Sequence, residues 1–324
     1  MIKIEPLQNH HLESLLALFN EETKQTSFLY KPLTLETFKD KFFPHQADNY
    51  DVLSFIILDD QLPLGFISGV TYPSRQKAYL TMVVVAASSR RQKLGTQLFH
   101  HFQDSVQKIE PSVKTIDIVF FNPIQFEWLI PDTNNHDHPN TPGVDTENQA
   151  LPFFESLGFT VFAKQNSYYH SILNYTYSED IQKRMANLKQ EGIGFSLYDE
   201  HVHHGFNTFF QELNNDVWEK DLLLAATRKQ PILIAHHNQK VIGFAGPLAV
   251  QPSLRGYFNG IGVSNEYRGK GVGKILFSSL CYHLSQLGAH YMSLFTGETN
   301  PARKIYENEG FQIVRSWNNL RKEY

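Results

Sequence analysis

The sequence predicts an α+β fold in two tandem domains, each built on a mixed, mostly antiparallel sheet flanked by helices. Three observations support this prediction: the chain length, an internal repeat, and the order of predicted helices and strands within each copy. A chain of 324 residues is long enough for about two domains with separate cores. Helices that alternate with mostly antiparallel strands around one sheet are typical of the α+β class.

The internal repeat relates two pairs of glycine-containing stretches. Gly95 matches Gly273 when TMVVVAASSRRQKLGTQLFHHF is aligned with FNGIGVSNEYRGKGVGKILFSSL. Gly158 matches Gly310 when ENQALPFFESLGF is aligned with ETNPARKIYENEGF. Such self-similarity indicates a duplicated chain. Because the two stretches are further apart in the first copy, that copy carries an insertion, residues 122–147.

Apolar residues that recur every two or every four positions place the elements of the first copy. We expect helices at residues 12–19 and 35–42, and further helices from Leu94 and from Asn148. We expect strands at residues 2–5, 52–58, 64–71, 78–85 and 115–121, with closing strands up to about residue 174. Residues 176–192 predict a linking helix, which Ser178 can cap and Gly192 can end.

The second copy follows from residue 193. Its helices are expected near residues 202–213 and 217–226, and its strands at residues 232–235, 241–250, 256–263 and 290–295. The predicted organisation is therefore an N-terminal domain (1–175, with the insertion 122–147), a linker helix (176–192) and a C-terminal domain (193–324).

A glycine-rich turn, Arg268-Gly-Lys-Gly-Val-Gly273, separates the strand at 256–263 from a helix on which Val272, Leu276 and Leu280 recur. Glycines remove the side chains that would keep a ligand away from the backbone, and N–H groups at a helix N-terminus attract anions. The turn therefore predicts a site for a phosphate or pyrophosphate. It lacks the Ser or Thr of a P-loop and the glycine spacing of a dinucleotide fingerprint.

The Arg-x-x-Gly-x-Gly pattern of this turn resembles motif A, the acyl-coenzyme A loop of the GNAT N-acetyltransferase superfamily. GETNPARKIYENEGF, at residues 297–311, resembles motif B of the same superfamily. The resemblance covers nearly the whole chain and is to members with two GNAT domains. It implies transfer of an acetyl group from acetyl-CoA to an amine acceptor, by direct attack in a ternary complex. The residues it implies for acetyl-CoA binding are Ile261, Gly262, Val263, Arg268, Gly269, Lys270, Gly271, Val272, Gly273, Lys274, Asn300 and Arg303.

The resemblance also implies Tyr306 as the general acid that protonates the departing thiolate. A tyrosine at this place could instead pack between helix and sheet, and Asn300 could be a helix cap. The sequence does not identify the general base, because no acidic residue lies on the strand at 256–263. Glu298 is the nearest candidate, although it could be a solvated loop carboxylate. Cys281 is expected to pack in the core rather than to form an acyl-enzyme.

The first copy departs from both motifs. Lys93 stands where motif A has glycine, and Phe154 stands opposite Tyr306. Lysine adopts a positive φ less readily than glycine, and phenylalanine has no proton to donate. We therefore expect the first domain to be a degenerate, non-catalytic copy, and the C-terminal domain to be catalytic. The insertion 122–147 either shapes an acceptor site or is a plain surface loop.

Composition excludes several classes of function. The net charge of −4 and the scattered Lys and Arg residues give no basic patch for nucleic acid. No apolar run is long enough to span a bilayer, and a single cysteine fits a reducing cytosol, so a cytoplasmic protein is expected. The histidines at 136–138 and 201–204 lack the spacing of a metal site, and none is predicted.

Two questions stay open at this stage. The chain could be a monomer or a homodimer, since a duplicated chain can already supply a pseudo-dimer. The alternative to a transferase is a non-catalytic acyl-CoA-binding sensor or a partner-binding module.

Overall fold

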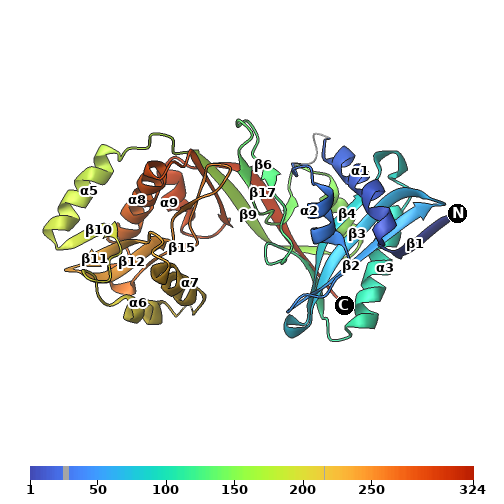
Figure 1. Cartoon of the computed structure of the whole chain (residues 1–324), viewed down its shortest axis with the longest axis horizontal. Helices are drawn as coiled ribbons and strands as arrows, with labels where there is room; N and C mark the ends of the chain where they lie inside the picture. Colours follow the sequence, from blue (N-terminus) through green and yellow to red (C-terminus); the bar gives the residue numbers. More distant parts are fainter. Residues whose placement is uncertain (25–28, 215) are drawn as a thin grey trace. The chain divides into compact units, whose positions relative to one another are not determined.

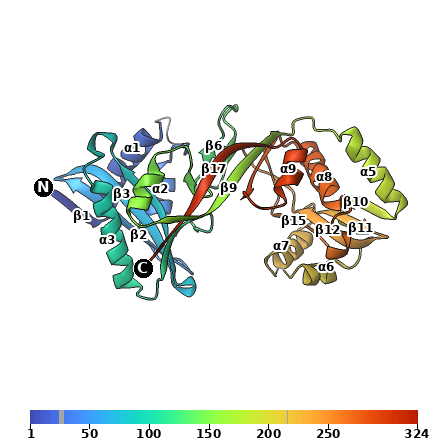
Figure 2. The ribbon, with the colours of Figure 1, turned by 180° about the vertical axis from the view of Figure 1, so that it is seen from behind.

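The computed structural model describes residues 1–24, 29–214 and 216–324 (Figure 1; seen from behind in Figure 2). The chain divides into two compact units. Unit 1 comprises Met1–Ser167 and Arg315–Tyr324, and unit 2 comprises Tyr168–Val314. No helix in the described ranges combines the length and the apolar character needed to cross a membrane.

Unit 1 is built on a mixed sheet in which every neighbouring pair is antiparallel except β4 and β5, which are parallel. Its strands in spatial order are β1 (Ile2–Pro6), β2 (Asp51–Asp59), β3 (Leu62–Tyr72), β4 (Lys77–Val85), β5 (Thr115–Ile118) and β17 (Gln312–Glu323). The insertion forms three short strands: β6 (Trp128–Leu129) pairs with β7 (Asp137–His138), and β8 (Val144–Asp145) pairs with β17.

Helices cover both faces of this sheet. Leu15 and Phe19 of α1 (Leu12–Thr23) and Phe38 of α2 (Leu35–Phe42) share one buried cluster with β2 and β3. Leu98 and Phe102 of α3 (Leu94–Ile109) share the second cluster, on the other side of the same strands, and α4 (Ala150–Ser156) adds to it. The side chain of Thr34 caps α2 by accepting a hydrogen bond from the N–H of Thr37.

Unit 2 repeats this layering around a four-stranded antiparallel sheet, with α5 and α8 on one face and α6 and α7 on the other (Figure 1). The strands in order are β10 (Ile193–Leu197), β11 (Leu233–His237), β12 (Lys240–Gly246) and β15 (Gly260–Val263). The helices are α5 (Glu179–Gln190), α6 (Phe206–Leu213), α7 (Asp216–Thr227), α8 (Val272–Gln286) and α9 (Arg303–Asn308). A further strand, β14 (Arg255–Tyr257), is antiparallel to β13 (Ala249–Val250) and parallel to β16 (Tyr291–Gly297).

The closing strands do not each stay with their own copy. The end of β17 completes unit 1, where Leu320 pairs with Ile118 of β5 and the guanidinium of Arg321 donates two 2.8 Å hydrogen bonds to Asp117. The other closing strand, β9 (Thr160–Ser171), begins in unit 1 and ends in unit 2. The compact units therefore divide at 167/168 and 314/315, whereas the domains expected from the sequence are 1–175 and 193–324, joined by the linker helix 176–192.

Most predicted elements are present, with α5 capped as expected by Ser178, whose Oγ accepts from the N–H of Ile181 at 3.3 Å. Four expectations need correction. The helix expected at 202–213 begins only at Phe206, and the strand expected at 115–121 ends at Ile118. The strand expected at 241–250 is broken into β12 and β13, and the strand expected at 256–263 is broken into β14 and β15.

Candidate functional site

The glycine-rich turn of unit 2 leaves its backbone open, as the sequence analysis predicted. Gly269 and Gly271 have φ values of 78° and 83°, a conformation that glycine adopts without steric cost. No described atom lies within 4 Å of a Cβ built on either residue. Gly271 is the N-cap of α8, so the first N–H groups of this helix, which have no partner inside it, face the same open space.

Hydrogen bonds of Arg268 and Glu212 fix the conformation of the turn. The N–H of Arg268 donates to the carbonyl of Asn265 at 3.3 Å, and its Nε donates to the carbonyl of Val263 at 3.2 Å. The carboxylate of Glu212 on α6 accepts from Ser264 Oγ at 2.8 Å and from the N–H of Asn265 at 3.0 Å. These hydrogen bonds lower the pKa of Glu212, so its charge and its hold on the turn persist at neutral pH.

The lysines of the turn are partly engaged. Lys270 Nζ lies 5.0 Å from the ring centroid of Tyr267, and Lys274 Nζ pairs with Asp180 of α5 at 3.0 Å. Both cations stay at the start of α8, where they add positive potential near an anion bound by the backbone.

The strand break next to the turn opens the sheet of unit 2. β14 pairs with β16 at Arg255 and Gly256, whereas β15 pairs with β12 from Gly260 to Val263. Between them the side chain of Asn259 donates to the carboxylate of Asp221 on α7 at 2.7 Å. β15 is the last strand of the four-stranded sheet, so its outer edge offers N–H and C=O groups to a ligand.

Helix α9 packs against the start of α8. A Cβ built on Gly273 would lie 3.6 Å from Ile305 and 3.7 Å from Val263, so turn, strand and α9 meet at this glycine. Tyr306 is 8% exposed, and its ring centroid lies 4.9 Å from that of Phe277 and 5.9 Å from that of Tyr168. Burial, and then the nearby Tyr168, raise the pKa of Tyr306, so its phenol stays protonated at neutral pH.

The other predicted residues of this region have structural partners. Asn300 Oδ1 accepts from the N–H of Ala302 at 2.9 Å, a local turn contact, and the N-cap of α9 is Ala302 rather than Asn300. Arg303 pairs with Glu307 at 3.0 Å and donates to the carbonyl of Glu298 at 2.8 Å. The side chain of Glu298 is exposed in the turn after β16.

Cys281 is fully buried within the apolar core around α8. Burial raises its pKa well above the ordinary thiol value, so the thiolate needed for nucleophilic attack is disfavoured. This environment agrees with the expected core packing.

Unit 1 builds the same turn with Arg91 and Lys93 in place of Gly269 and Gly271. Arg91 and Lys93 both have φ of 63°, and Lys93 is the N-cap of α3. Arg90 Nε donates to the carbonyl of Val85 at 3.0 Å, as Arg268 does to Val263. Glu22 on α1 accepts from the N–H of Ala87 at 2.8 Å and pairs with Arg90. Lys93 thus adopts the positive φ that lysine takes less readily than glycine.

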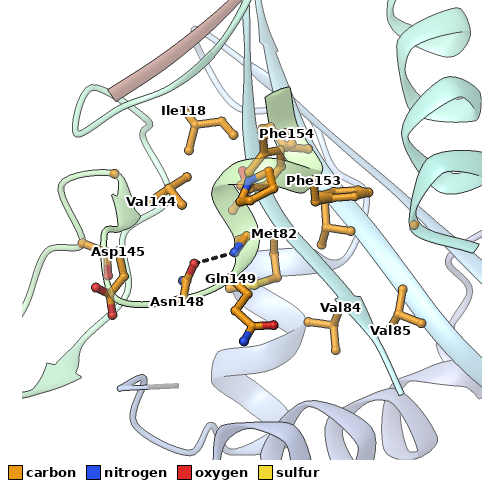
Figure 3. Close-up of a pocket in the computed structure, with 18 of the residues that line it drawn as sticks. Met82, Val84, Val85, Ile118, Val144, Asp145, Asn148, Gln149, Phe153 and Phe154 are labelled. Atoms are coloured by element: carbon orange, nitrogen blue, oxygen red, sulfur yellow. Dashed lines mark hydrogen bonds between the residues drawn. The ribbon is translucent and has the colours of Figure 1, made fainter. Parts of the chain in front are cut away.

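A cavity of about 1210 Å³ opens beside this turn in unit 1. β4 pairs with β5 only from Lys77 to Tyr79, and the register of β4 against β3 shifts so that Thr81 is an extra, bulged residue. Bulges often lie next to functional sites because they redirect the strand. The lining comes from β4, the turn, α4 and the insertion, as Figure 3 shows for Val84, Val85, Phe153, Phe154 and Asp145.

The insertion therefore lines this cavity rather than forming a plain surface loop. It contributes Ile124, Phe126, Val144 and Asp145 among others. Asp145 is 8% exposed, and burial raises its pKa, an effect partly offset by the N–H of Glu147 and by Arg315.

Comparison with known proteins identifies the fold and the family. The sequence profile of the acetyltransferase (GNAT) family matches residues 15–113 and 195–311, one match in each copy. The chain belongs to the acetyltransferase (GNAT) family. Its two-copy arrangement is shared with a tandem GNAT protein from the clavulanic acid biosynthesis pathway. That structure has a TM-score of 0.60 and 13% identity, over 100% of this chain and 98% of that one.

Two further proteins are similar to this GNAT chain. A glucosamine N-acetyltransferase region of a fungal multi-domain GH3 β-N-acetylglucosaminidase has a TM-score of 0.69 and 15% identity, over 99% of this chain and 38% of that one. The ribosomal protein bS18-alanine N-acetyltransferase of Haemophilus influenzae is 36% identical over 87 residues, which are 27% of this chain and 56% of that protein. The match thus spans little more than half of that relative.

Two carboxylates of this GNAT chain were missed by sequence reasoning. Asp221 reaches the strand break of unit 2 from α7, and Asp145 reaches the cavity of unit 1 from the insertion. Neither residue lies in a motif, so the residues adjacent to it in the sequence do not indicate a functional role. The insertion itself was the one available indication for Asp145, because long insertions beside a motif are often functional.

Proposed function

We propose that the chain transfers an acetyl group from acetyl-CoA to an amine acceptor, with unit 2 carrying the chemistry. The observation that supports this most directly is the turn at the start of α8. Gly269 and Gly271 are both left-handed, and no described atom fills the space in front of them. A backbone cradle at a helix N-terminus suits a pyrophosphate, and family membership makes an acyl-CoA the fitting donor.

The residues that would hold acetyl-CoA are those of the turn and of β15. The free N–H groups from Gly269 to Lys274 would bind the pyrophosphate, while Arg268 holds the turn from behind. The outer edge of β15, Ile261 to Val263, would hydrogen-bond the amide groups of the pantetheine arm. When bound, acetyl-CoA supplies an activated thioester. Its remote contacts mainly fix the position of that group.

Tyr306 is the proposed general acid. Its phenol has a raised pKa, so it arrives protonated and can give that proton to a departing thiolate. Its burial among Phe277, Tyr168 and Phe311 excludes water and fixes the ring. Proton donation by a positioned side chain contributes about 10²–10⁴-fold in typical enzymes.

Two carboxylates of unit 2 can accept the proton of the amine. Asp221 is held by Asn259 at the strand break, where the edge of β15 begins. Glu298 lies in the exposed turn after β16, and its backbone carbonyl is tied to Arg303. The geometry favours Asp221, because the strand break is where the two halves of the sheet separate and a second substrate can enter.

The proposed acceptor is a primary amine. The relative from Haemophilus influenzae is named for acetylating the alanine of a ribosomal protein, so a peptide N-terminus is the first acceptor to test. An α-amino group has a pKa near 8, so a useful fraction is already neutral at pH 7. A reaction that consumes acetyl-CoA also fits the expected cytoplasmic location.

The test is to incubate the protein with acetyl-CoA and peptides that begin with alanine, and with small primary amines as a second set. Mass spectrometry should detect acetylated product at a rate well above that without protein. Binding of acetyl-CoA with no acetylated product across both sets would favour the alternative, a non-catalytic acyl-CoA sensor.

A further inference from the structure

β10 is an outer strand of the four-stranded sheet of unit 2, and no other strand within the described ranges pairs with its outer edge (Figure 1). On its inner side, the N–H of Asn238 donates to the carbonyl of Gly192 at 3.0 Å, and the N–H of Tyr198 donates to the carbonyl of Ile232 at 2.8 Å. Hydrogen-bonded pairs alternate along an antiparallel ladder. Three residues between these pairs therefore direct their N–H and C=O groups outward, away from β11: Ile193, Phe195 and Leu197.

The equivalent edge strand of unit 1 is β1, and its residues oppose pairing with a further strand. The registers of β1 against β2 and of β10 against β11 coincide under the internal repeat, so the two strands can be compared residue by residue. Charged side chains and proline are the usual means by which an edge strand avoids pairing, and proline has no N–H to donate. β1 has both and β10 has neither, since Lys3, Glu5 and Pro6 of β1 correspond to Gly194, Ser196 and Leu197 of β10. The chain thus protects one of two equivalent edges and leaves the other open.

A groove of about 460 Å³ follows this open edge of β10. Met185 of α5 lines it on one face of the sheet, where Phe195 packs against the core around α5 and α8. On the other face, Gly194 lies directly against the ring of His236. The groove therefore gives access to both faces of the edge, as an added strand requires. Leu197, further along the strand, is 41% exposed.

We propose that β10 pairs with β10 of a second copy of this chain, antiparallel about a two-fold axis at Phe195. Such a pair joins the sheets of the two copies into one continuous sheet, and its contacts are the same on both copies. Phe195 then lies opposite Phe195 of the second copy, and Ile193 lies opposite Leu197. In each of these pairs the outward N–H and C=O groups face each other. The three side chains share one face of β10, so the apolar row continues across the pair and covers the exposed Leu197.

The charges of α5 suit the same arrangement. Gly192, with φ of 79°, turns the chain back so that α5 runs antiparallel to β10, and the two-fold axis then places α5 beside its counterpart in the opposite direction. The first turn of α5 has Glu179 and Asp180 and its last turn has Lys189, all of them exposed. The acidic first turn of each helix therefore lies near the basic last turn of the other. The surface is complementary to itself, which favours a second copy over an unrelated peptide.

The test is sedimentation velocity of the full chain over a range of concentrations, for the wild type and for the Leu197→Lys and Leu224→Lys variants. We expect the wild type to form a dimer that dissociates on dilution. Leu197→Lys should raise the dissociation constant of this dimer at least tenfold, because pairing would bury an ammonium group without a partner. Leu224 is 49% exposed on α7, so Leu224→Lys makes the same chemical change away from β10 and should dimerise like the wild type. A wild type that stays monomeric, or a dimer of equal affinity in Leu197→Lys, would overturn the proposal.

Cysteine cross-linking tests the register of the pair independently. Opposed Cα atoms of a hydrogen-bonded pair lie about 5.5 Å apart, which a disulfide can span, so Phe195→Cys should cross-link the two copies under mild oxidation. Leu197→Cys is the matched control, because two such cysteines would lie about 13 Å apart along the strands. Cys281 is fully buried and does not compete. Equal cross-linking in the two variants would overturn the proposal, whereas absence of acetyl transfer in unit 2 would leave both measurements unaffected.

Discussion

Lys93 and Gly271 occupy the same position in their two units and share a left-handed backbone conformation, with φ of 63° and 83°. Each is the N-cap of the helix that follows the turn. For glycine this conformation is without steric cost, whereas for lysine it is strained. A non-glycine residue kept in this region indicates that the surrounding structure, or a ligand, requires the turn.

Replacing Lys93 by glycine should therefore stabilise unit 1. Removing the strain of a left-handed lysine is worth about 1 kcal/mol, which urea unfolding followed by a probe in unit 1 would measure. Lys93→Ala is the matched control, since alanine removes the charge but keeps the strain. An equal gain in both variants would show that charge repulsion, not backbone strain, is the cause.

Replacing Tyr306 by phenylalanine should lower kcat for acetyl transfer by about 10²-fold or more while acetyl-CoA affinity stays within a few-fold. The substitution removes one hydroxyl from a buried ring, so packing against Phe277 is kept. Tyr282→Phe, on α8, is the control and should retain activity. Unchanged kcat in Tyr306→Phe would contradict its role as general acid.

The carboxylate that accepts the amine proton can be identified by a pair of variants. If Asp221 has this role, Asp221→Asn should lower kcat/KM for the amine at pH 7. The decrease in kcat/KM should be smaller at higher pH, where more of the amine is already deprotonated. Acetyl-CoA affinity should be unaffected. Glu298→Gln is predicted to behave like wild type. The reverse result would assign the role to Glu298.

Asp145 should make the stability of unit 1 depend on pH. Burial raises its pKa in the folded state, so folding favours the protonated acid. Its contribution is fully present below the unfolded pKa and is lost as pH rises through the folded pKa. Asp145→Asn cannot ionise, so its stability relative to wild type should increase between about pH 4 and pH 7, by about 1.4 kcal/mol for each unit of the shift. Thermal unfolding at both pH values measures this, and a constant difference would contradict it.

Local sequence signals predicted the elements around the site well. Gly95 and Gly273 were matched by the repeat, and each lies in the first turn of a helix at the predicted place. Ser178 and Thr34 illustrate why: caps and apolar spacing act over a few residues, so the sequence shows them directly.

Contacts between residues far apart in the sequence could not be predicted from it. Leu320 pairs with Ile118 in unit 1, although it belongs to the second copy. Because both copies offer equivalent sheets, the alternation within a strand does not reveal which sheet it joins. The Asn259–Asp221 contact joins a strand break to a helix, and its partners lie 38 positions apart in no shared motif.

Acetyl-CoA binding at the start of α8 is tested most directly by calorimetric titration. Gly271→Glu and Lys93→Glu place the same negative side chain at the equivalent position of each unit, where a phosphate would bind. Wild type is predicted to bind acetyl-CoA at one site, in unit 2, with that binding lost in Gly271→Glu and retained in Lys93→Glu. Binding by Gly271→Glu that is indistinguishable from wild type would contradict the placement in unit 2. Failure of the wild type to bind acetyl-CoA would contradict the proposed function as a whole.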